Sequence, residues 1–222
     1  MWSPDETEII FSSDQLALFD LYRRPLDRSK PEQLLYKSAN DKQINDWSSD
    51  GKFLLFPRGG IPRPEAMYGC CRSVKPEPRP LLQTKADEWE SRFSPDVRWV
   101  AYMSNESGQN QIYVQSFPDA AIRVPISREG GTNPRWHPQG KELFFIGRDN
   151  ALMSVEVQTD ASGLRAGPPK TLFTLPMLGP APVVAGYDLS SDGERFLMNL
   201  QVPGSTADHI AVVLNWLADV KR

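Results

Sequence analysis

One pattern recurs five times along the 222-residue chain and restricts the folds that it can adopt. Each copy is a large apolar residue followed by a turn segment related to Ser-Pro-Asp-Gly. The copies begin at Trp2, Trp47, Phe93, Trp136 and Leu189, so successive copies lie 45, 46, 43 and 53 residues apart. A repeat with a period of about 20 to 50 residues indicates a solenoid, a propeller or another array of similar units.

Four short strands are predicted around each turn. The first leads into the turn, and the second is an apolar triplet that starts seven residues after the large apolar residue. The triplets are Ile9-Ile10-Phe11, Leu54-Leu55-Phe56, Val100-Ala101-Tyr102, Leu143-Phe144-Phe145 and Phe196-Leu197-Met198. Third strands are predicted over 16–22, 67–74, 111–117, 152–157 and 210–216, and fourth strands over 33–36, 81–83, 122–126 and 171–173. We therefore expect an all-β fold, a β-propeller of four-stranded antiparallel blades.

The repeats divide the chain into five predicted blades within a single domain, residues 1–222. Their approximate ranges are 1–40, 41–86, 87–130, 131–183 and 184–222. A helical solenoid is excluded because 20 prolines and 15 glycines interrupt every candidate helix. The first blade starts at the end of its inner strand and the fifth ends after its third strand, so we expect part of a six- to eight-bladed propeller rather than a closed five-bladed ring. An open array would expose strand edges and favour self-association.

The repeat copies resemble the TolB-type propeller repeat, a relative of the WD-repeat blade. That repeat has an aromatic residue followed by Ser-Pro-Asp-Gly and a strand, and the best copies here start at Trp47 and Phe93. Individual copies depart from it: Glu6 and Val97 replace glycine, and His137 and Gln139 replace serine and aspartate. The resemblance covers nearly the whole chain and rests on the array rather than on one copy.

A narrower resemblance rests on residues 102–118 and 210–216. These segments look like the propellers that follow a cytoplasmic Ser/Thr protein kinase domain in bacteria, often across a membrane segment. The resemblance implies a sensor-like or scaffold domain at the C-terminal end of a larger signalling protein. Such a propeller would be periplasmic or otherwise extracytoplasmic if a transmembrane helix precedes it, and cytoplasmic if none does.

Composition excludes two classes of partner. A formal charge of -3 and a pI near 5.5 provide no basic surface for nucleic acid. No run of 18 or more apolar residues occurs, and the acidic segment 1–6 does not resemble a signal peptide. We expect neither nucleic-acid binding nor direct insertion of this chain into a membrane.

Catalytic motifs are missing from the sequence. It has no G-x-S-x-G nucleophile elbow and no kinase catalytic loop, and the glycine pairs in 58–60 and 129–131 lack the lysine of a phosphate loop. Of the two histidines, His137 lies inside a repeat turn and His209 precedes the last predicted strand. We therefore expect this chain not to be an enzyme.

Metal and cofactor sites are not predicted either. The two histidines and the adjacent Cys70 and Cys71 have no zinc-ligand spacing. The aspartates of the turns could suggest calcium, but turn formation already explains them and the EF-hand spacing is absent. Most tryptophans fall on the repeat register and are expected between blades, whereas Trp89 lies among charged residues and is expected to be exposed.

Candidate binding residues lie on the strand that leads into each turn, because innermost strands line the central channel of a propeller. They are Asn45, Asp46, Glu90, Arg92, Asn133 and Arg135. An array without catalytic groups suggests a module that binds a protein, a peptide or a small-molecule signal at this face. The alternative is the gating or substrate-selecting propeller of a peptidase whose catalytic domain lies elsewhere in the parent protein.

Overall fold

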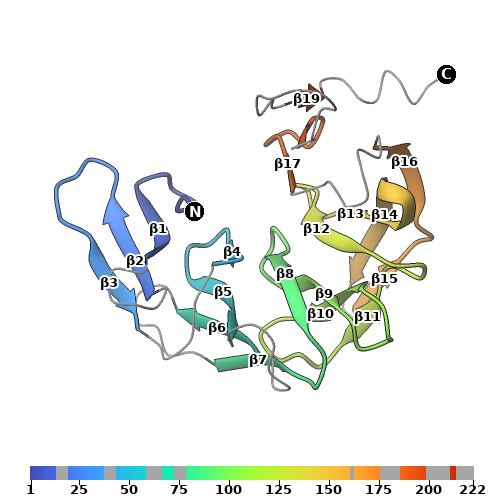
Figure 1. Cartoon of the computed structure of the whole chain (residues 1–222), viewed down its shortest axis with the longest axis horizontal. Coiled ribbons are helices and arrows are strands. Elements are labelled where there is room, and N and C mark those ends of the chain that lie inside the picture. The colour runs from blue at the N-terminus through green and yellow to red at the C-terminus, as the bar shows by residue number, and fades with distance from the viewer. Residues whose placement is uncertain are drawn as a thin grey trace, which may run out of the picture.

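The strands form five antiparallel sheets that follow one another along an arc (Figure 1). The computed structural model describes residues 1–13, 20–37, 44–58, 67–72, 79–160, 163–175, 186–198 and 211–213. Each sheet is one blade of a propeller and lies within one of the five ranges expected from the repeat. The predicted all-β propeller fold is confirmed.

The strand bounds follow blade by blade. The first blade has β1 (Glu8–Ser13), β2 (Asp20–Pro25) and β3 (Gln33–Tyr36), and the second has β4 (Asp46–Trp47), β5 (Phe53–Arg58), β6 (Met67–Arg72) and β7 (Arg79–Gln83). The third has β8 (Glu88–Phe93), β9 (Trp99–Ser104), β10 (Gln111–Ser116) and β11 (Arg123–Pro125). The fourth has β12 (Thr132–Trp136), β13 (Glu142–Ile146), the short helix η1 (Arg148–Asn150), β14 (Ala151–Asp160), β15 (Gly163–Ala166) and β16 (Lys170–Thr174). The fifth has β17 (Tyr187–Leu189), β18 (Phe196–Met198) and β19 (Ala211–Val213).

The fourth blade differs from the expected four strands. Strand β14 runs to Asp160, beyond the predicted end at Val157, because its first half pairs with β16 and its second half with β15. The sequence signal for this hairpin is weak, since residues 158–160 at the end of β14 are polar. Leu164 nevertheless buries its side chain in the core between the third and fourth blades, and this packing stabilises the additional hairpin.

The five turns have the same backbone conformation. The residue four after the large apolar residue has a positive φ in every copy: Glu6 (56°), Gly51 (72°), Val97 (58°), Gly140 (71°) and Gly193 (77°). In four copies a serine hydroxyl donates a hydrogen bond to the aspartate two residues later and accepts one from the backbone N–H five residues later. The repeat is thus a local hydrogen-bonded unit that fixes the start of the second strand.

Successive turns are neighbours, so they mark one face of the arc, which we call the turn face. Ser49 donates its hydroxyl hydrogen to the carbonyl oxygen of Pro95 at 2.6 Å, linking the second and third turns. A Cβ atom at Gly140 would lie 3.7 Å from the Pro95 ring, and one at Gly193 would overlap the His137 ring. The turns occupy equivalent places from blade to blade, as a propeller requires.

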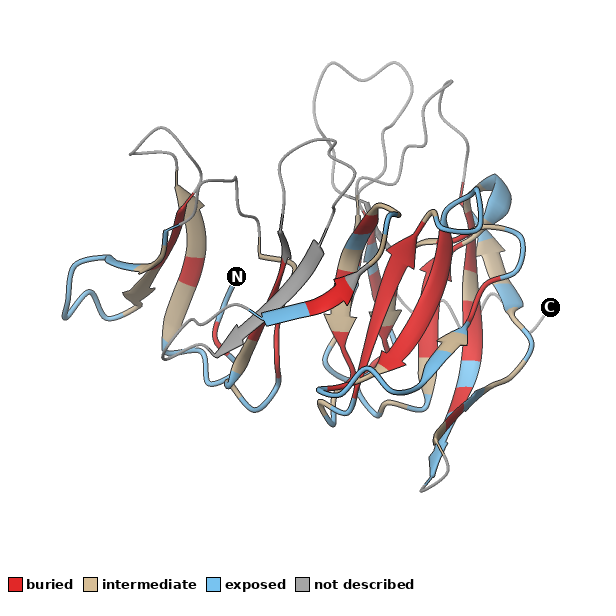
Figure 2. Cartoon of the chain, turned by 90° about the horizontal axis from the view of Figure 1, so that it is seen from below, coloured by how far each residue is buried: buried red, intermediate tan, exposed pale blue. Residues whose placement is uncertain are grey.

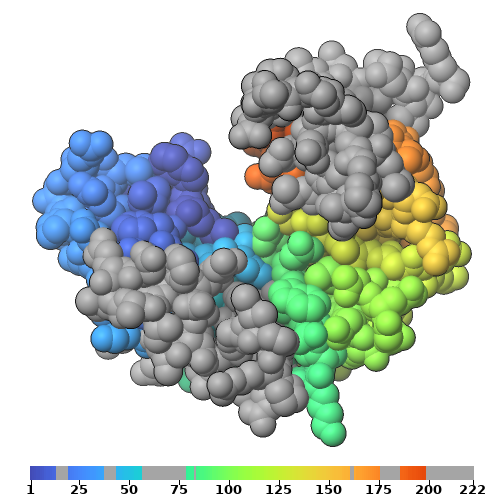
Figure 3. Space-filling view, in the orientation of Figure 1, coloured from blue at the N-terminus to red at the C-terminus, as the bar shows by residue number. Residues whose placement is uncertain are grey.

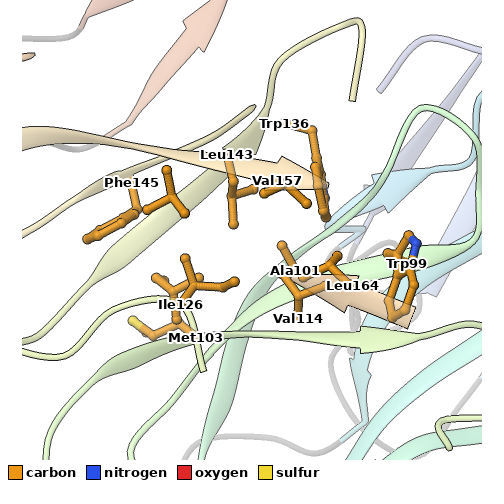
Figure 4. Close-up of a cluster of buried hydrophobic side chains, with 12 residues drawn as sticks. Trp99, Ala101, Met103, Val114, Ile126, Trp136, Leu143, Phe145, Val157 and Leu164 are labelled. Atoms are coloured by element: carbon orange, nitrogen blue, oxygen red, sulfur yellow. The ribbon is translucent and has the colours of Figure 1, made fainter. Parts of the chain in front are cut away.

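The core lies between blades and follows one rule. In the first four triplets the middle residue faces the following blade, and in the last four the first and third residues face the preceding one. Ile10 packs against Leu54 and Phe56 of the second blade, and Phe144 packs in the same way on Phe196 and Met198. Figure 4 shows the cluster between the third and fourth blades, where Ala101, Leu143 and Phe145 meet.

Burial is greatest in the middle of the array. Figure 2 shows mostly buried residues in the central strands, whereas the sheet nearest the N-terminus is largely intermediate. The difference follows from the packing rule, because a central blade is covered on both faces by neighbouring blades. Within the described part of the chain, no helix is long and apolar enough to cross a membrane.

Candidate functional site

The inner ends of the blades surround one cavity of about 550 Å³ at the turn face. All five blades contribute to its lining: Met1, Trp2 and Pro4, then Asn45, Asp46, Trp47 and Ser49, then Arg92 to Pro95, then Arg135, Trp136 and Pro138, and finally Asp188. We call this cavity the channel mouth. Equivalent residues of successive repeats meet here because each inner strand ends at the same large apolar residue.

Polar contacts at the channel mouth join the second blade to the third. The Asp46 carboxylate accepts a hydrogen bond from the backbone N–H of Phe93, with an N–O distance of 2.6 Å. The Arg92 guanidinium donates to the carbonyl oxygen of Asn45 and, at 2.8 Å, to that of Ser91. These bonds hold two inner strands together, so Asp46 and Arg92 have a structural role as well as a place in the cavity lining.

Matching bulges join the third blade to the fourth. Strand pairing shifts register between Trp89 and Arg92 and again between Thr132 and Arg135. At the bulges, Glu90 and Asn133 have φ values of 56° and 55°. The backbone N–H of Asn133 donates to the Glu90 carboxylate at 2.5 Å. A bulge re-aims side chains locally, and here it turns Glu90 toward the next blade.

Arg135 faces the fifth blade and is held less tightly than Arg92. Its guanidinium donates to the carbonyl oxygen of Pro134 at 2.9 Å, and its Nε lies 4.0 Å from an Asp188 carboxylate oxygen. The guanidinium carbon lies 5.6 Å from the centre of the Tyr187 ring, within cation–π range. Because a 4.0 Å ion pair is weak, Arg135 keeps capacity to bind an anionic group from a ligand.

Burial near the channel mouth shifts the pKa values of three groups. Burial raises the pKa of Asp46 to about 6, although the positive charges of Arg92 and Arg135 act in the opposite direction. Burial and the charge of Arg135 lower the pKa of the Arg92 guanidinium, while nearby carboxylates oppose that change. Burial also raises the pKa of the Tyr187 hydroxyl. Asp46 and Arg92 are thus desolvated charges between the blades rather than freely solvated surface groups.

Of the six residues predicted from sequence, Asn45, Asp46, Arg92 and Arg135 line the channel mouth, whereas Glu90 and Asn133 line a separate pocket. Most of the six contact a neighbouring blade. Asn45, Asp46, Glu90, Arg92 and Asn133 all take part in the inter-blade bonds described above. Sequence reasoning missed Tyr187 and Asp188 of the fifth blade. Asp188 could have been predicted from its position in the repeat, because Asp188 precedes Leu189 as Asp46 precedes Trp47.

The structure also bears on the expectations for the tryptophans, histidines and cysteines. Trp47, Trp99 and Trp136 are buried as expected, and Trp89 is 40% exposed. Trp2 departs from the prediction of a core position, since it is 61% exposed on a blade face that no described blade covers. His137 accepts a hydrogen bond from the backbone N–H of Gln139 at its Nδ1, which is a turn role. His209 and the side chains of Cys70 and Cys71 lie outside the described residues.

The described side chains define the chemical groups available at the channel mouth. Among the residues that the structure describes, no three His, Cys, Asp or Glu side chains are placed to hold a metal ion together. The lining of the channel mouth includes two guanidinium groups, two carboxylates and aromatic side chains. Such a surface can recognise a polar or charged group together with an apolar one.

The sequence is similar to part of a curated protein. No family model matches the sequence. A curated protein of Agrobacterium fabrum is 26% identical over 125 residues, which is 52% of this chain and 42% of that protein. The chain thus spans less than half the length of this relative.

Solved structures share the propeller architecture. TolB from Acinetobacter baumannii superposes with a TM-score of 0.71 at 16% identity, over 91% of this chain and 48% of that one. A TolB-like protein of Agrobacterium tumefaciens gives 0.61 at 22% identity, over 78% and 63%, and a puromycin-hydrolyzing peptidase of Mycobacterium tuberculosis gives 0.59 at 15%, over 99% and 38%. These proteins show that the chain has a TolB-like β-propeller fold. They include both a non-enzyme and an enzyme, so the fold does not decide whether the chain is catalytic.

Proposed function

We propose that the chain is a non-catalytic binding module whose ligand is a polypeptide segment held at the channel mouth. The observation that carries the proposal is that all five blades contribute to one cavity at the turn face. A site built from equivalent strand ends on a packed scaffold is pre-organised, which lowers the entropic cost of binding.

The chemistry of the cavity favours a ligand with an acidic group next to an apolar one. Arg135 can pair with a carboxylate, since its only described ion pair, with Asp188, is weak. Met1 and Trp2 supply exposed apolar surface on the opposite side of the same cavity. A peptide with an acidic side chain or a free C-terminal carboxylate fits this arrangement better than a small apolar molecule does.

In the larger protein, this module would act as the sensor or scaffold domain of a bacterial signalling protein linked to a Ser/Thr kinase. The support for this part is the sequence resemblance over residues 102–118 and the many contacts that a propeller face offers. The gating propeller of a peptidase remains the second hypothesis, and the sequence that flanks this array in its gene distinguishes the two. A kinase domain upstream supports the first, and a hydrolase domain supports the second.

The binding proposal is tested by selection from a displayed library of random peptides on the immobilised chain. The Kd of an enriched peptide is then measured for the wild type and for Arg135→Gln. We expect about tenfold weaker binding to the variant, equivalent to the loss of one charge-assisted contact. The matched control is Arg195→Gln, an exposed arginine outside the cavity that pairs with Asp192. Equal affinity of all three proteins would contradict the proposed site.

A further inference from the structure

We propose that a pocket between the third and fourth blades binds a free α-amino acid with an apolar side chain. The pocket has a volume of about 500 Å³, within the range of small-molecule sites. It is lined by the loop before β12, by η1 and its flanking residues, and by β16, and we call it the seam pocket. It shares no lining residue with the channel mouth, so this inference does not depend on the proposed function.

The seam pocket lies at the end of the blades opposite the turn face. Strand β13 begins after the fourth turn and ends at Ile146, so Gly147 and η1 lie at its far end. Figure 4 shows Phe145 at one end of the inter-blade cluster and Trp99, whose backbone N–H bonds to its turn, at the other. Figure 3 shows the third blade, in green, in contact with the fourth, in yellow. The base of the pocket is therefore a packed interface between two blades.

The floor of the seam pocket is apolar. Phe145 is 2% exposed and Met153 is half-buried, and both pack in the core between the two blades. A Cβ atom at Gly147 would lie 2.8 Å from the Met153 side chain and 3.6 Å from the Phe145 ring. Glycine at position 147 therefore lets the backbone lie directly against these side chains, which a larger residue would displace. Such a floor can cover an apolar group of a ligand and remove it from water.

Charged side chains of both signs form the rim around this floor. The loop before β12 contributes Arg128 and Glu129, and η1 contributes Arg148 and Asp149. All four are exposed, and among the residues that the structure describes none of them has an ion-pair partner. A ligand that carries both charges can pair with a cation and with a carboxylate of this rim. A purely anionic or purely cationic ligand would also meet like charges, which oppose binding.

The backbone of η1 is held in a conformation that its residues rarely adopt. Asp149 and Asn150 both have a φ of 56°, in the left-handed region. In the third blade, the corresponding connection between β9 and β10 has its positive φ at Gly108 instead. Glycine at position 149 would adopt this conformation without strain but would remove a carboxylate from the rim. Strain that the surrounding structure maintains is common at ligand-binding sites.

An α-amino acid is the ligand that uses all of these groups together. Its carboxylate can pair with a guanidinium group of the rim and its ammonium with a carboxylate of the rim. Its side chain can then cover the apolar floor, and the volume of about 500 Å³ accommodates a side chain as large as that of phenylalanine.

Titration calorimetry with L-phenylalanine and two analogues tests the class of ligand. The analogue 3-phenylpropionate lacks the ammonium group, and phenethylamine lacks the carboxylate. We expect saturable binding of L-phenylalanine to the 222-residue chain. Each analogue should bind about tenfold more weakly or worse, because it loses one charged contact. Absence of saturable L-phenylalanine binding, or equal affinity for either analogue, would overturn the proposal.

Two variants test where L-phenylalanine binds. Arg148→Gln removes a charge from the rim, and Thr171→Phe fills the pocket from β16, where the threonine hydroxyl lies 3.4 Å from the Met153 sulfur. We expect about tenfold weaker binding to each variant. The matched controls are Arg98→Gln and Thr159→Phe, which replace exposed residues outside the pocket and should bind as the wild type does.

Wild-type affinity in either pocket variant would contradict the assignment of the site. A loss of L-phenylalanine binding in Arg135→Gln but not in Arg148→Gln would also overturn the proposal, because the ligand would then occupy the channel mouth.

Discussion

Asp46 shows how the channel mouth combines structure with charge. Its carboxylate bonds to the backbone of the next blade, yet burial raises its pKa to about 6. A carboxyl group with a higher pKa in the folded state than in the unfolded state binds protons more tightly when folded. Its contribution to stability is therefore complete below about pH 4 and is lost as the pH rises through about 6.

Asp46→Asn should remove this pH dependence. The amide oxygen can still accept the Phe93 N–H, so we expect wild-type stability at pH 4 and a gain of the order of 2 kcal/mol at pH 7. Urea unfolding at intervals from pH 4 to 7 measures the difference. Asp192→Asn is the control. The hydroxyl of Ser190 lowers the pKa of Asp192, so we expect no gain in stability at pH 7 from this substitution. A constant difference between wild type and Asp46→Asn over this range would show that the group titrates normally.

The positive φ shared by the five turns predicts substitutions with opposite effects. Glu6 is exposed at this register with φ of 56°, so Glu6→Gly should stabilise the protein by about 0.5 kcal/mol or more. Gly51 has the same conformation and open space around its Cα, so Gly51→Ala should destabilise it by about 1 kcal/mol through backbone strain alone. Both values are measured by denaturant unfolding. Two changes of the same sign would mean that the turns differ in conformation.

At the scale of elements, the hairpin of β14 and β15 extends the fourth blade over the third. Leu164 on β15 is buried in the cluster that includes Trp99 and Val157. Ile122, which follows the end of β10, lies close to Gly163 at the start of β15. The hairpin therefore contributes to the interface between two blades as well as to its own sheet.

Leu164→Ala should consequently destabilise the protein by about 2 to 3 kcal/mol, the usual cost of removing a buried leucine side chain. Leu197→Ala in the same chain is the matched control, because its side chain is exposed and should cost less than about 0.5 kcal/mol. Equilibrium urea unfolding gives both values. Similar costs for the two variants would indicate that the hairpin does not pack on the core.

The elements that sequence predicts well are those in which local and tertiary preferences agree. The apolar triplets and the turns repeat at nearly constant spacing, so each copy supports the others. Strand β15 could not be predicted in this way, because its partner residues 158–160 are polar and the pairing depends on tertiary packing of Leu164. The bulges at Glu90 and Asn133 also depend on contacts between blades, which no single repeat reveals.

At the scale of the molecule, the position of a residue within the repeat determines which of three structural features it forms. The triplets build the cores between blades, the turns mark one face, and the residues before each turn meet at the channel mouth. Sequence reasoning named four residues of the cavity lining but not their contacts. Whether a charged side chain faces solvent or the next inner strand depends on how the blades are rotated against each other.

The central claim is that this register creates a binding site at the channel mouth. Hydrogen exchange of the chain with and without an enriched peptide tests it most directly. We predict slower exchange at residues 44–47, 91–94 and 133–136 on binding, and no change at the outer strands 79–83 and 123–125. Protection confined to the outer strands, with the inner strands unaffected, would contradict the claim.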